Sequence, residues 1–442
     1  MANTYISRTH SGTATDTKKI TYSAWLKFGT DDSTEAILVE WLDGNYRVEF
    51  LRLDTGEIRF EWIDSGNNSA YFKTVRKFKD VNAWYHFVFT LDTTLATAGD
   101  RIKLYINGVR ETEFDSSYGT MNPTLNKACR MNENGKTVYM GQRGNSAQYW
   151  TGSMSHIHFV DGTAYQADTF GSTDSTTGEW KINTSPTVTY GNHGWFILKD
   201  GNSVTDQSGN GNNCTASGTL TKTEDNPSNV FATFNSLMHF RQPTPLLYGN
   251  TGIENGDTQW ENGYGTIATP TTGKFYAEFK YPTFRSGATY AHAGIIAVDD
   301  IATQASGYLN FGDAPNSWTL SVTDGDVYNN GSSIATYSSI SANGIIGLAI
   351  DCTNSKLYIS VNGTWQNSAD PSAGTGGISI TSNKEYFVGG KVYNADIYAN
   401  FGNGYFGTTA VSSAGTNASN NGIFEYDVPT GYTALSTKGL NE

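Results

Sequence analysis

Short stretches of alternating hydrophobic and polar residues follow one another through almost the whole chain. In EIRFEWI (residues 57–63), Ile58, Phe60 and Trp62 alternate with charged side chains, which predicts a strand with one buried face. Similar runs extend from residue 20 to about residue 170 and resume at residue 273, and we find no segment with helical periodicity. The pattern predicts an all-β chain whose antiparallel strands pack as two β-sandwiches.

Two Asn-Gly pairs give the clearest turn signals. Asn107-Gly108 interrupts RIKLYINGVRETEF (residues 101–114), and Asn362-Gly363 interrupts KLYISVNGTWQNS (residues 356–368). A type I′ turn requires positive φ at both central residues, which Asn and Gly tolerate best. We therefore expect a β-hairpin at each place, and two sheet domains of related build.

Length and composition fit two such domains. The 442 residues include 22 Phe, 26 Tyr, 10 Trp and 48 Gly, a composition typical of turn-rich β proteins. Residues 223–250 hold three prolines and no sustained period, so we expect a connector there, between a domain at 1–222 and a domain at 251–442. Within the first domain, residues 194–218 are expected to form a closing pair of strands.

Charge and cysteine content exclude several classes of function. With 29 basic and 42 acidic residues the net charge is −13, which disfavours a nucleic-acid partner. No apolar run approaches the length of a membrane span and the start lacks a secretory pattern, so we expect no membrane insertion and synthesis in a cytoplasm. Cys129, Cys214 and Cys352 are odd in number and far apart, which predicts buried or semi-buried free thiols.

The order of the strands resembles two known families. The succession of WYHFVFTLD (residues 84–92), RIKLYINGVRETEF, VYMGQ and YWTGSMSHIHFVDGTAY resembles the laminin G-like, concanavalin A-like sandwich, over roughly residues 1–170. The succession of GKFYAEF (residues 273–279), GIIGLAIDCTNSKLYISVNGTW, YANFG and FEYDVPTGYTALSTKGLNE resembles a SPRY domain, over about residues 227–440. These resemblances imply a concanavalin A-like sandwich followed by a SPRY-like one.

The two halves in this order, joined by a DNPSNVFATFN segment, resemble accessory virion proteins of tailed bacteriophages. That resemblance implies location on the virion and a non-enzymatic surface subunit that recognises a host-surface glycan or protein. A decoration or connector subunit that binds other virion proteins is one alternative, and a glycan-cleaving enzyme is another. Because a single recognition site binds weakly, we expect a homo-oligomer, with a trimer as one arrangement.

Two groups of residues are candidates for catalysis or metal binding. Glu111, Glu113 and Asp115 alternate along the returning hairpin strand, and glycosidases use paired carboxylates. Their order does not match the motif of sandwich-fold glycosidases, so we favour a solvated strand face. His156 and His158 share a strand face near Asp161, which is the beginning of a metal site, but no third ligand has matching spacing and a solvent-facing pair is favoured.

The loop DGNSVTDQSGNGNN (residues 200–213) offers the oxygen ligands that calcium prefers. The candidate ligands are Asp200, Asp206 and Asn210, with Asn212 beside them. Asx-turns account for the same residues without a metal, and both interpretations stay open. No other cofactor is expected.

Aromatic residues near loops are the remaining candidates for ligand binding. A flat ring stacks on a sugar face while nearby polar groups bond its hydroxyls, although for any single ring core or rim packing is the favoured explanation. We expect residues 313–330 and 362–377 to form the contact surface, because binding residues concentrate on loops held by a rigid scaffold. The candidate rings are those of Tyr149, Trp150, Trp318, Tyr328 and Trp365.

Overall fold

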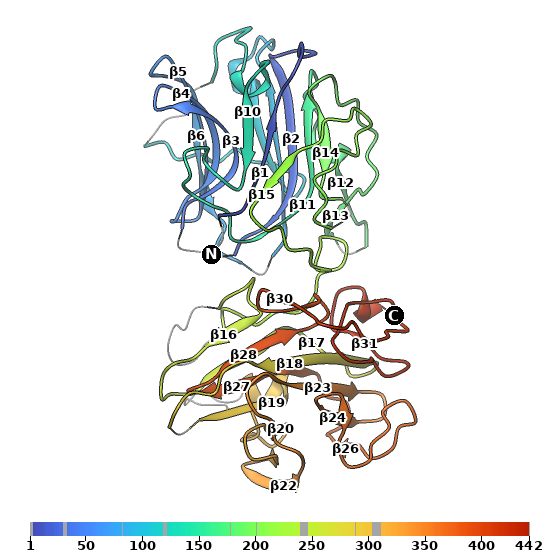
Figure 1. Cartoon of the computed structure of the whole chain (residues 1–442). Coiled ribbons are helices and arrows are strands. Elements are labelled where there is room, and N and C mark those ends of the chain that lie inside the picture. Colours follow the sequence, from blue (N-terminus) through green and yellow to red (C-terminus); the bar gives the residue numbers. More distant parts are fainter. Residues whose placement is uncertain are drawn as a thin grey trace. The chain divides into compact units, whose positions relative to one another are not determined.

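A computed structural model gives the fold of the chain. It describes residues 3–29, 33–81, 83–117, 122–176, 178–199, 201–238, 246–287, 289–302 and 311–441. The chain divides into two compact units, Met1–Lys222 and Thr223–Glu442, whose regular structure is nearly all β-strand (Figure 1). The prediction of two antiparallel β-sandwiches is confirmed.

Helices are short wherever the structure describes the chain. They are α1 (Val298–Ala302) and four single 3-10 turns, η1 (Ala98–Asp100), η2 (Arg130–Asn132), η3 (Ala167–Thr169) and η4 (Gly439–Asn441). Within the described ranges, no helix has the length and apolar character needed to cross a bilayer.

The first unit packs a seven-stranded sheet against a six-stranded one. The seven-stranded sheet has the order β15 (Thr215–Ser217), β1 (Tyr5–Thr9), β10 (Thr137–Met140), β3 (Glu35–Asp43), β4 (Tyr46–Arg52), β5 (Glu57–Asp64), β6 (Asn67–Lys77). The six-stranded sheet has the order β14 (Trp195–Ile197), β11 (Ser153–Asp161), β2 (Lys19–Lys27), β7 (Tyr85–Asp92), β8 (Ile102–Ile106), β9 (Val109–Arg110). Both contribute to one hydrophobic core, which includes Ile58, Phe60 and Trp62 as their alternation predicts.

Residues 194–218 do not form the expected strand pair. Within this segment, β14 pairs with β11 in one sheet and β15 pairs with β1 in the other. The segment therefore contributes one strand to each layer of the sandwich.

A second layer covers the outer face of the six-stranded sheet. It contains η3 and the two-stranded sheet of β12 (Gly171–Thr173) and β13 (Trp180–Ile182). Phe170 of this layer and Phe196 of β14 pack with Val88 of β7 in a small cluster of their own. Both faces of this sheet are thus buried in its centre.

The second unit has an eight-stranded and a six-stranded sheet. The eight-stranded sheet runs β16 (Gly252–Glu254), β28 (Asp396–Asn400), β18 (Lys274–Tyr281), β23 (Gly344–Asp351), β24 (Lys356–Val361), β25 (Thr364–Trp365), with β26 (Ile378–Ser379) pairing with β24 and β31 (Thr433–Ala434) pairing in parallel with β18. The six-stranded sheet runs β17 (Glu261–Ala268), β27 (Tyr386–Tyr393), β19 (Tyr290–Ala297), β20 (Ser317–Ser321), β21 (Asp326–Asn329), β22 (Ser332–Thr336). A separate hairpin joins β29 (Tyr405–Phe406) to β30 (Thr409–Ala410).

Residues 223–250 are not a free connector where the structure describes them. Phe231 forms a β-bridge with Ser436, and Phe234 lies in the core of the second unit. The described part of the expected connector therefore belongs to that unit, since Phe231 and Phe234 pack with its buried residues.

Both predicted hairpin turns are confirmed. Asn107 and Gly108 have φ of 48° and 81°, and Asn362 and Gly363 have φ of 48° and 79°. The prediction of free buried thiols is also confirmed for all three cysteines, and burial raises the pKa of the Cys129 thiol to about 12.

Candidate functional site

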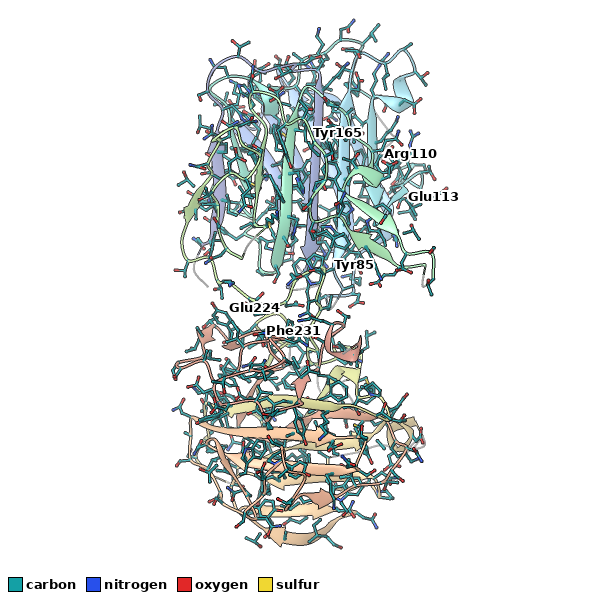
Figure 2. The ribbon with its side chains drawn as sticks, turned by 90° about the vertical axis from the view of Figure 1, so that its right-hand side faces the viewer. Tyr85, Arg110, Glu113, Tyr165, Glu224 and Phe231 are labelled. Atoms are coloured by element: carbon teal, nitrogen blue, oxygen red, sulfur yellow. The ribbon has the colours of Figure 1, made fainter. Side chains whose placement is uncertain are left out.

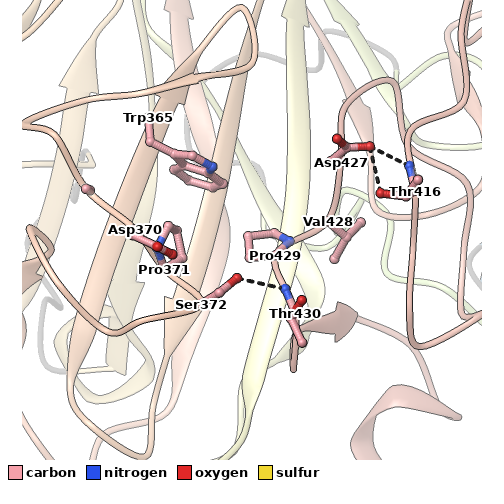
Figure 3. Close-up of a pocket in the computed structure, with 10 residues that line it drawn as sticks. Trp365, Asp370, Pro371, Ser372, Thr416, Asp427, Val428, Pro429 and Thr430 are labelled. Atoms are coloured by element: carbon pink, nitrogen blue, oxygen red, sulfur yellow. Dashed lines mark hydrogen bonds between the residues drawn. The ribbon is translucent and has the colours of Figure 1, made fainter.

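A pocket of about 420 Å³ opens on the second unit, between the segment after β25 and the segment before β31 (Figure 3). Pockets of this size suit small ligands such as a sugar residue. Its lining residues are Trp365, Ala369, Asp370, Pro371, Ser372, Thr416, Asp427, Val428, Pro429 and Thr430.

Hydrogen bonds hold the polar lining in place. The Oδ1 atom of Asp427 accepts bonds from the backbone N–H of Thr416 at 2.6 Å and from its hydroxyl at 2.8 Å. These bonds hold the pKa of Asp427 below its usual value, so the carboxylate stays ionised. Across the pocket, the N–H of Thr430 donates to the Oγ of Ser372 at 3.0 Å, which ties the two walls together (Figure 3).

Trp365 supplies the aromatic surface of the pocket. Its ring is half-buried and meets the ring of Tyr276 edge to face, with centroids 6.3 Å apart. Tyr276 is itself wholly buried and packs against Phe424 at 4.9 Å. The indole is therefore fixed by a rigid aromatic layer while part of it stays open to solvent.

A buried carboxyl, Glu278 on β18, positions one wall of the pocket. It accepts hydrogen bonds from the backbone N–H groups of Glu425 and Tyr426 at 2.8 and 2.9 Å, and from the Tyr276 hydroxyl at 3.0 Å. Burial raises the pKa of Glu278 to about 7, although these hydrogen bonds favour its ionised form. Because residues 425 and 426 directly precede Asp427, Glu278 fixes the backbone that carries the pocket carboxylate.

The polar side chains that line the pocket carry either a carboxylate or a hydroxyl group. Carboxylates and hydroxyls surround one half-buried indole, and their side chains come from Asp370, Ser372, Thr416, Asp427 and Thr430. Such groups accept and donate hydrogen bonds to hydroxyls, while an indole face suits the C–H face of a pyranose. The arrangement can bind a sugar without any covalent step.

The structure separates the five aromatic residues expected to bind a ligand. Trp318 lies in the core of the second unit, which agrees with core packing, the favoured explanation of this ring, and removes it as a candidate for ligand binding. Trp150 packs against the core of the first unit, 5.3 Å from Phe28, and the Tyr149 hydroxyl accepts a hydrogen bond from Gln142. Only Trp365 lines the pocket. Tyr328 lies elsewhere on the second unit, beside His292.

The two segments expected to form the contact surface also differ. Residues 362–377 supply half of the pocket lining. Half of residues 313–330 is strand and not loop, because the segment contains β20 and β21. The alternation Ser317, Trp318, Thr319, Leu320 directs the Trp318 and Leu320 side chains into the core.

The candidate calcium loop is held together by its own hydrogen bonds. The two carboxylate oxygens of Asp206 accept bonds from the N–H groups of Phe196, Ser208 and Asn212 and from the Ser208 hydroxyl. The Asn210 amide donates to two backbone carbonyls. Asp200 lies outside the described residues. The bond from the Ser208 N–H to Asp206 forms an Asx-turn, the local structure that the second interpretation of this loop names.

The hairpin carboxylates are not on one strand face. β9 ends at Arg110, and the chain then leaves the six-stranded sheet and reaches β6 of the other sheet, where Phe114 forms a β-bridge with Thr74. Arg110 and Glu113 lie at the outside of the unit (Figure 2). Asp115 pairs with Lys73 at 2.8 Å, and bonds from Lys73 and Ser117 lower the pKa of Asp115 to about 2.

The expectation that His156 and His158 face solvent is wrong. Both are buried, because the second layer covers this face of β11. A bulge at residue 156, where φ is 47°, changes the register of β11 against β2. His158 stacks on Phe196 at 3.9 Å and bonds the Tyr190 hydroxyl, and burial lowers its pKa well below the usual value. Asp161 accepts backbone bonds from Thr15, Asp16 and His193.

Sequence reasoning missed Glu278 and Asp427. The alternation of β18 places Glu278 on the face expected to be exposed to solvent, so the sequence pattern does not indicate that it is buried. Its partner Tyr276 was the available signal, since an aromatic residue on the polar face of a strand indicates that something covers that face.

Comparison with protein families gives a match within the first unit. Residues 2–169 match the family model described as the concanavalin A-like lectin/glucanases superfamily. The first unit contains a laminin G-like, concanavalin A-like domain. No curated protein matches the chain in sequence.

Several solved structures are similar to parts of the chain. The SPRY domain of human HERC1 is 13% identical, with a TM-score of 0.29 over 38% of this chain and 96% of that one. A candidate carbohydrate-binding protein from Bacteroides ovatus is 16% identical, with a TM-score of 0.32 over 50% of this chain and 58% of that one. Domains LG4-5 of the mouse laminin α1 chain are 8% identical, with a TM-score of 0.28 over 88% of this chain and 78% of that one.

Proposed function

We propose that this protein is a non-enzymatic recognition subunit of a virion surface, and that the pocket around Trp365 binds a host-surface glycan. The observation that carries the glycan-binding part is the fixed, half-buried indole of Trp365 beside the carboxylate of Asp427 and the hydroxyl of Ser372. A concanavalin A-like first unit is consistent with a binding role. The virion location rests on the sequence resemblance to phage accessory proteins.

The lining supports binding in preference to catalysis. A glycosidase needs a carboxylic acid whose pKa is raised so that it can protonate the leaving group. Asp427 has a lowered pKa because it accepts two bonds from Thr416, which suits an acceptor of sugar hydroxyls. One shallow site of this kind binds weakly, so we propose that several copies, with a trimer as one arrangement, act together on the particle.

A glycan array probed with the labelled full-length chain tests the pocket. The test variant is Trp365→Ala, which removes the stacking surface. The control is Leu237→Ala, since Leu237 is highly exposed in the same unit and does not line the pocket. We expect the natural chain and the control to bind the same glycans on the array. Trp365→Ala should no longer bind them, although circular dichroism shows that it remains folded.

Two results would refute parts of this proposal. Equal retention by Trp365→Ala would exclude the pocket as the glycan site. Shortening of retained oligosaccharides during incubation, detected by mass spectrometry, would replace the binding role with cleavage. Mass spectrometry of purified phage particles tests the virion location separately, because a virion subunit must co-purify with intact particles.

A further inference from the structure

A second group of polar and aromatic side chains lies on the face of the six-stranded sheet of the second unit that points away from its core. Tyr290 and His292 of β19 stand directly opposite Tyr393 and Lys391 of β27. The intervening residues of both strands, such as Ala291 and Val392, belong to the core on the other side. The cluster consists of Trp260, Tyr290, His292, Lys391 and Tyr393, and we call it the β19/β27 face.

Trp260 ties the aromatic rings of this face together. Its ring centroid is 5.9 Å from Tyr290, 5.6 Å from Tyr393 and 5.4 Å from His292. Tyr290 nevertheless remains 45% exposed. The face therefore presents the exposed phenol ring of Tyr290 beside the partly buried rings of Trp260 and Tyr393.

Lys391 is an unusual lysine, because its side chain is only 6% exposed. Its ammonium lies 4.7 Å from the centre of the Trp260 ring, and among the residues that the structure describes it makes one hydrogen bond, a long one of 3.4 Å, to Asp313. Burial lowers its pKa. A buried ammonium has three N–H donors, and burying it with a single long hydrogen bond costs free energy. Lys391 can therefore donate further hydrogen bonds to a ligand.

His292 adds a second group with unused capacity. It is 8% exposed, and within the described part of the chain its Nδ1 has no hydrogen-bond partner. Its ring lies between Trp260 and Tyr328, with centroids 5.4 and 6.0 Å away. Burial and the adjacent Lys391 hold its pKa well below the usual value, so the imidazole is neutral.

We propose that the β19/β27 face is a second glycan-binding site, which takes an uncharged hexopyranose residue. The pyranose stacks on Tyr290, its hydroxyls donate to the Asp313 carboxylate, whose side chain is 48% exposed, and Lys391 donates to a sugar oxygen. An uncharged sugar fits because the ammonium is already matched by a carboxylate, which would repel an acidic sugar. A purely apolar ligand would leave the polar groups unpaired.

This inference extends the proposed glycan-binding function, but it depends on residues that the Trp365 pocket does not share. Saturation-transfer NMR on the full-length chain tests it, with methyl β-D-glucopyranoside, methyl β-D-galactopyranoside and methyl α-D-mannopyranoside as neutral probes and methyl β-D-glucuronide as the acidic probe. The test variants are Tyr290→Ala and Asp313→Asn, of which the second is a conservative change at an exposed carboxylate. The controls are Trp365→Ala and Tyr248→Ala, since Tyr248 is also partly exposed (39%) in the same unit but packs against Tyr398 of the other sheet.

We expect a neutral probe to receive saturation from the chain, and its affinity to fall about tenfold or more in both test variants. Binding of a neutral probe that persists in Trp365→Ala and in Tyr248→Ala supports the β19/β27 face as a site, even if the Trp365 pocket does not bind sugars. The proposal is overturned if no neutral probe binds, if binding is unchanged in both test variants, or if only the glucuronide binds. If probe binding is lost in Trp365→Ala alone, the binding belongs to the Trp365 pocket and the β19/β27 face is excluded as a site.

Discussion

Asn107 holds the backbone of His86 through two hydrogen bonds. Its side-chain Oδ1 accepts the His86 N–H at 2.8 Å, and its own N–H donates to the His86 carbonyl at 2.9 Å. In the second unit Asn362 holds Ile345 in the same way, at 2.9 and 2.8 Å. Each hairpin asparagine therefore combines a left-handed turn conformation with a clamp on the neighbouring strand, β7 or β23.

The two functions of these asparagines are separable by substitution. Asn107→Gly and Asn362→Gly keep a residue that tolerates positive φ and lose only the side-chain bond, so we expect a loss of about 1 kcal/mol in unfolding free energy. Asn107→Ala and Asn362→Ala add backbone strain, and we expect about 2 kcal/mol. Urea unfolding measures both losses. Equal stability of the Ala and Gly variants would show that the turn conformation carries no cost.

The two units are expected to resist proteolysis independently, since each has its own hydrophobic core. Because residues 226–234 pair within the second unit, cleavage is expected near residues 218–224 and not within the segment that follows. Mass spectrometry of a limited digest should give two resistant fragments that meet there. A chain that is uniformly resistant, or fragments that lose structure when separated, would contradict independent folding.

The strands and hairpins could be predicted because their signals are local. The alternation of Ile58, Phe60 and Trp62 and the two Asn-Gly turns depend on neighbouring residues only. The outer layers could not be predicted, because they are irregular segments without a period. His158 and Glu278 occupy strand positions that the alternation predicts to be exposed to solvent. Both are buried, because residues from other parts of the chain cover them.

The pocket was only half predictable for the same reason. Trp365 directly follows a recognisable turn, so its place beside a loop could be derived. Asp427 comes from a segment with no local pattern. Hydrogen bonds between residues distant in sequence hold it at the pocket, from residues 425 and 426 to Glu278 and from Thr416 to Asp427 itself. The burial of Trp318 was available in principle, since Trp318 and Leu320 alternate with Ser317 and Thr319.

The hydrogen bonds of Asp206 predict that calcium does not stabilise the first unit. Both carboxylate oxygens already accept bonds from the chain. We expect the melting temperature to be unchanged by calcium or by EDTA, whereas Asp206→Ala should lower the unfolding free energy by about 2 kcal/mol. Differential scanning calorimetry with and without each additive measures this. A calcium-dependent rise that Asp206→Ala abolishes would establish a metal site at this loop.

Glu278 predicts a pH dependence in the stability of the second unit. Its pKa is raised by burial to about 7 in the folded chain, from 4.5 as the ordinary value. The folded state therefore binds a proton more tightly than the unfolded state does. The stabilisation is complete below pH 4.5 and is lost as pH rises to about 7, which amounts to about 3 kcal/mol.

Glu278→Gln isolates this contribution, because glutamine does not titrate. Its amide would face the N–H group of Glu425 or Tyr426, so we expect the variant to be less stable than the natural chain at low pH, by about 1–3 kcal/mol. The difference in unfolding free energy between the two proteins should then shrink as pH rises from 4.5 to 7. Calorimetry across this range measures it. If the difference stays constant, Glu278 is ionised throughout, and its hydrogen bonds outweigh the cost of its burial.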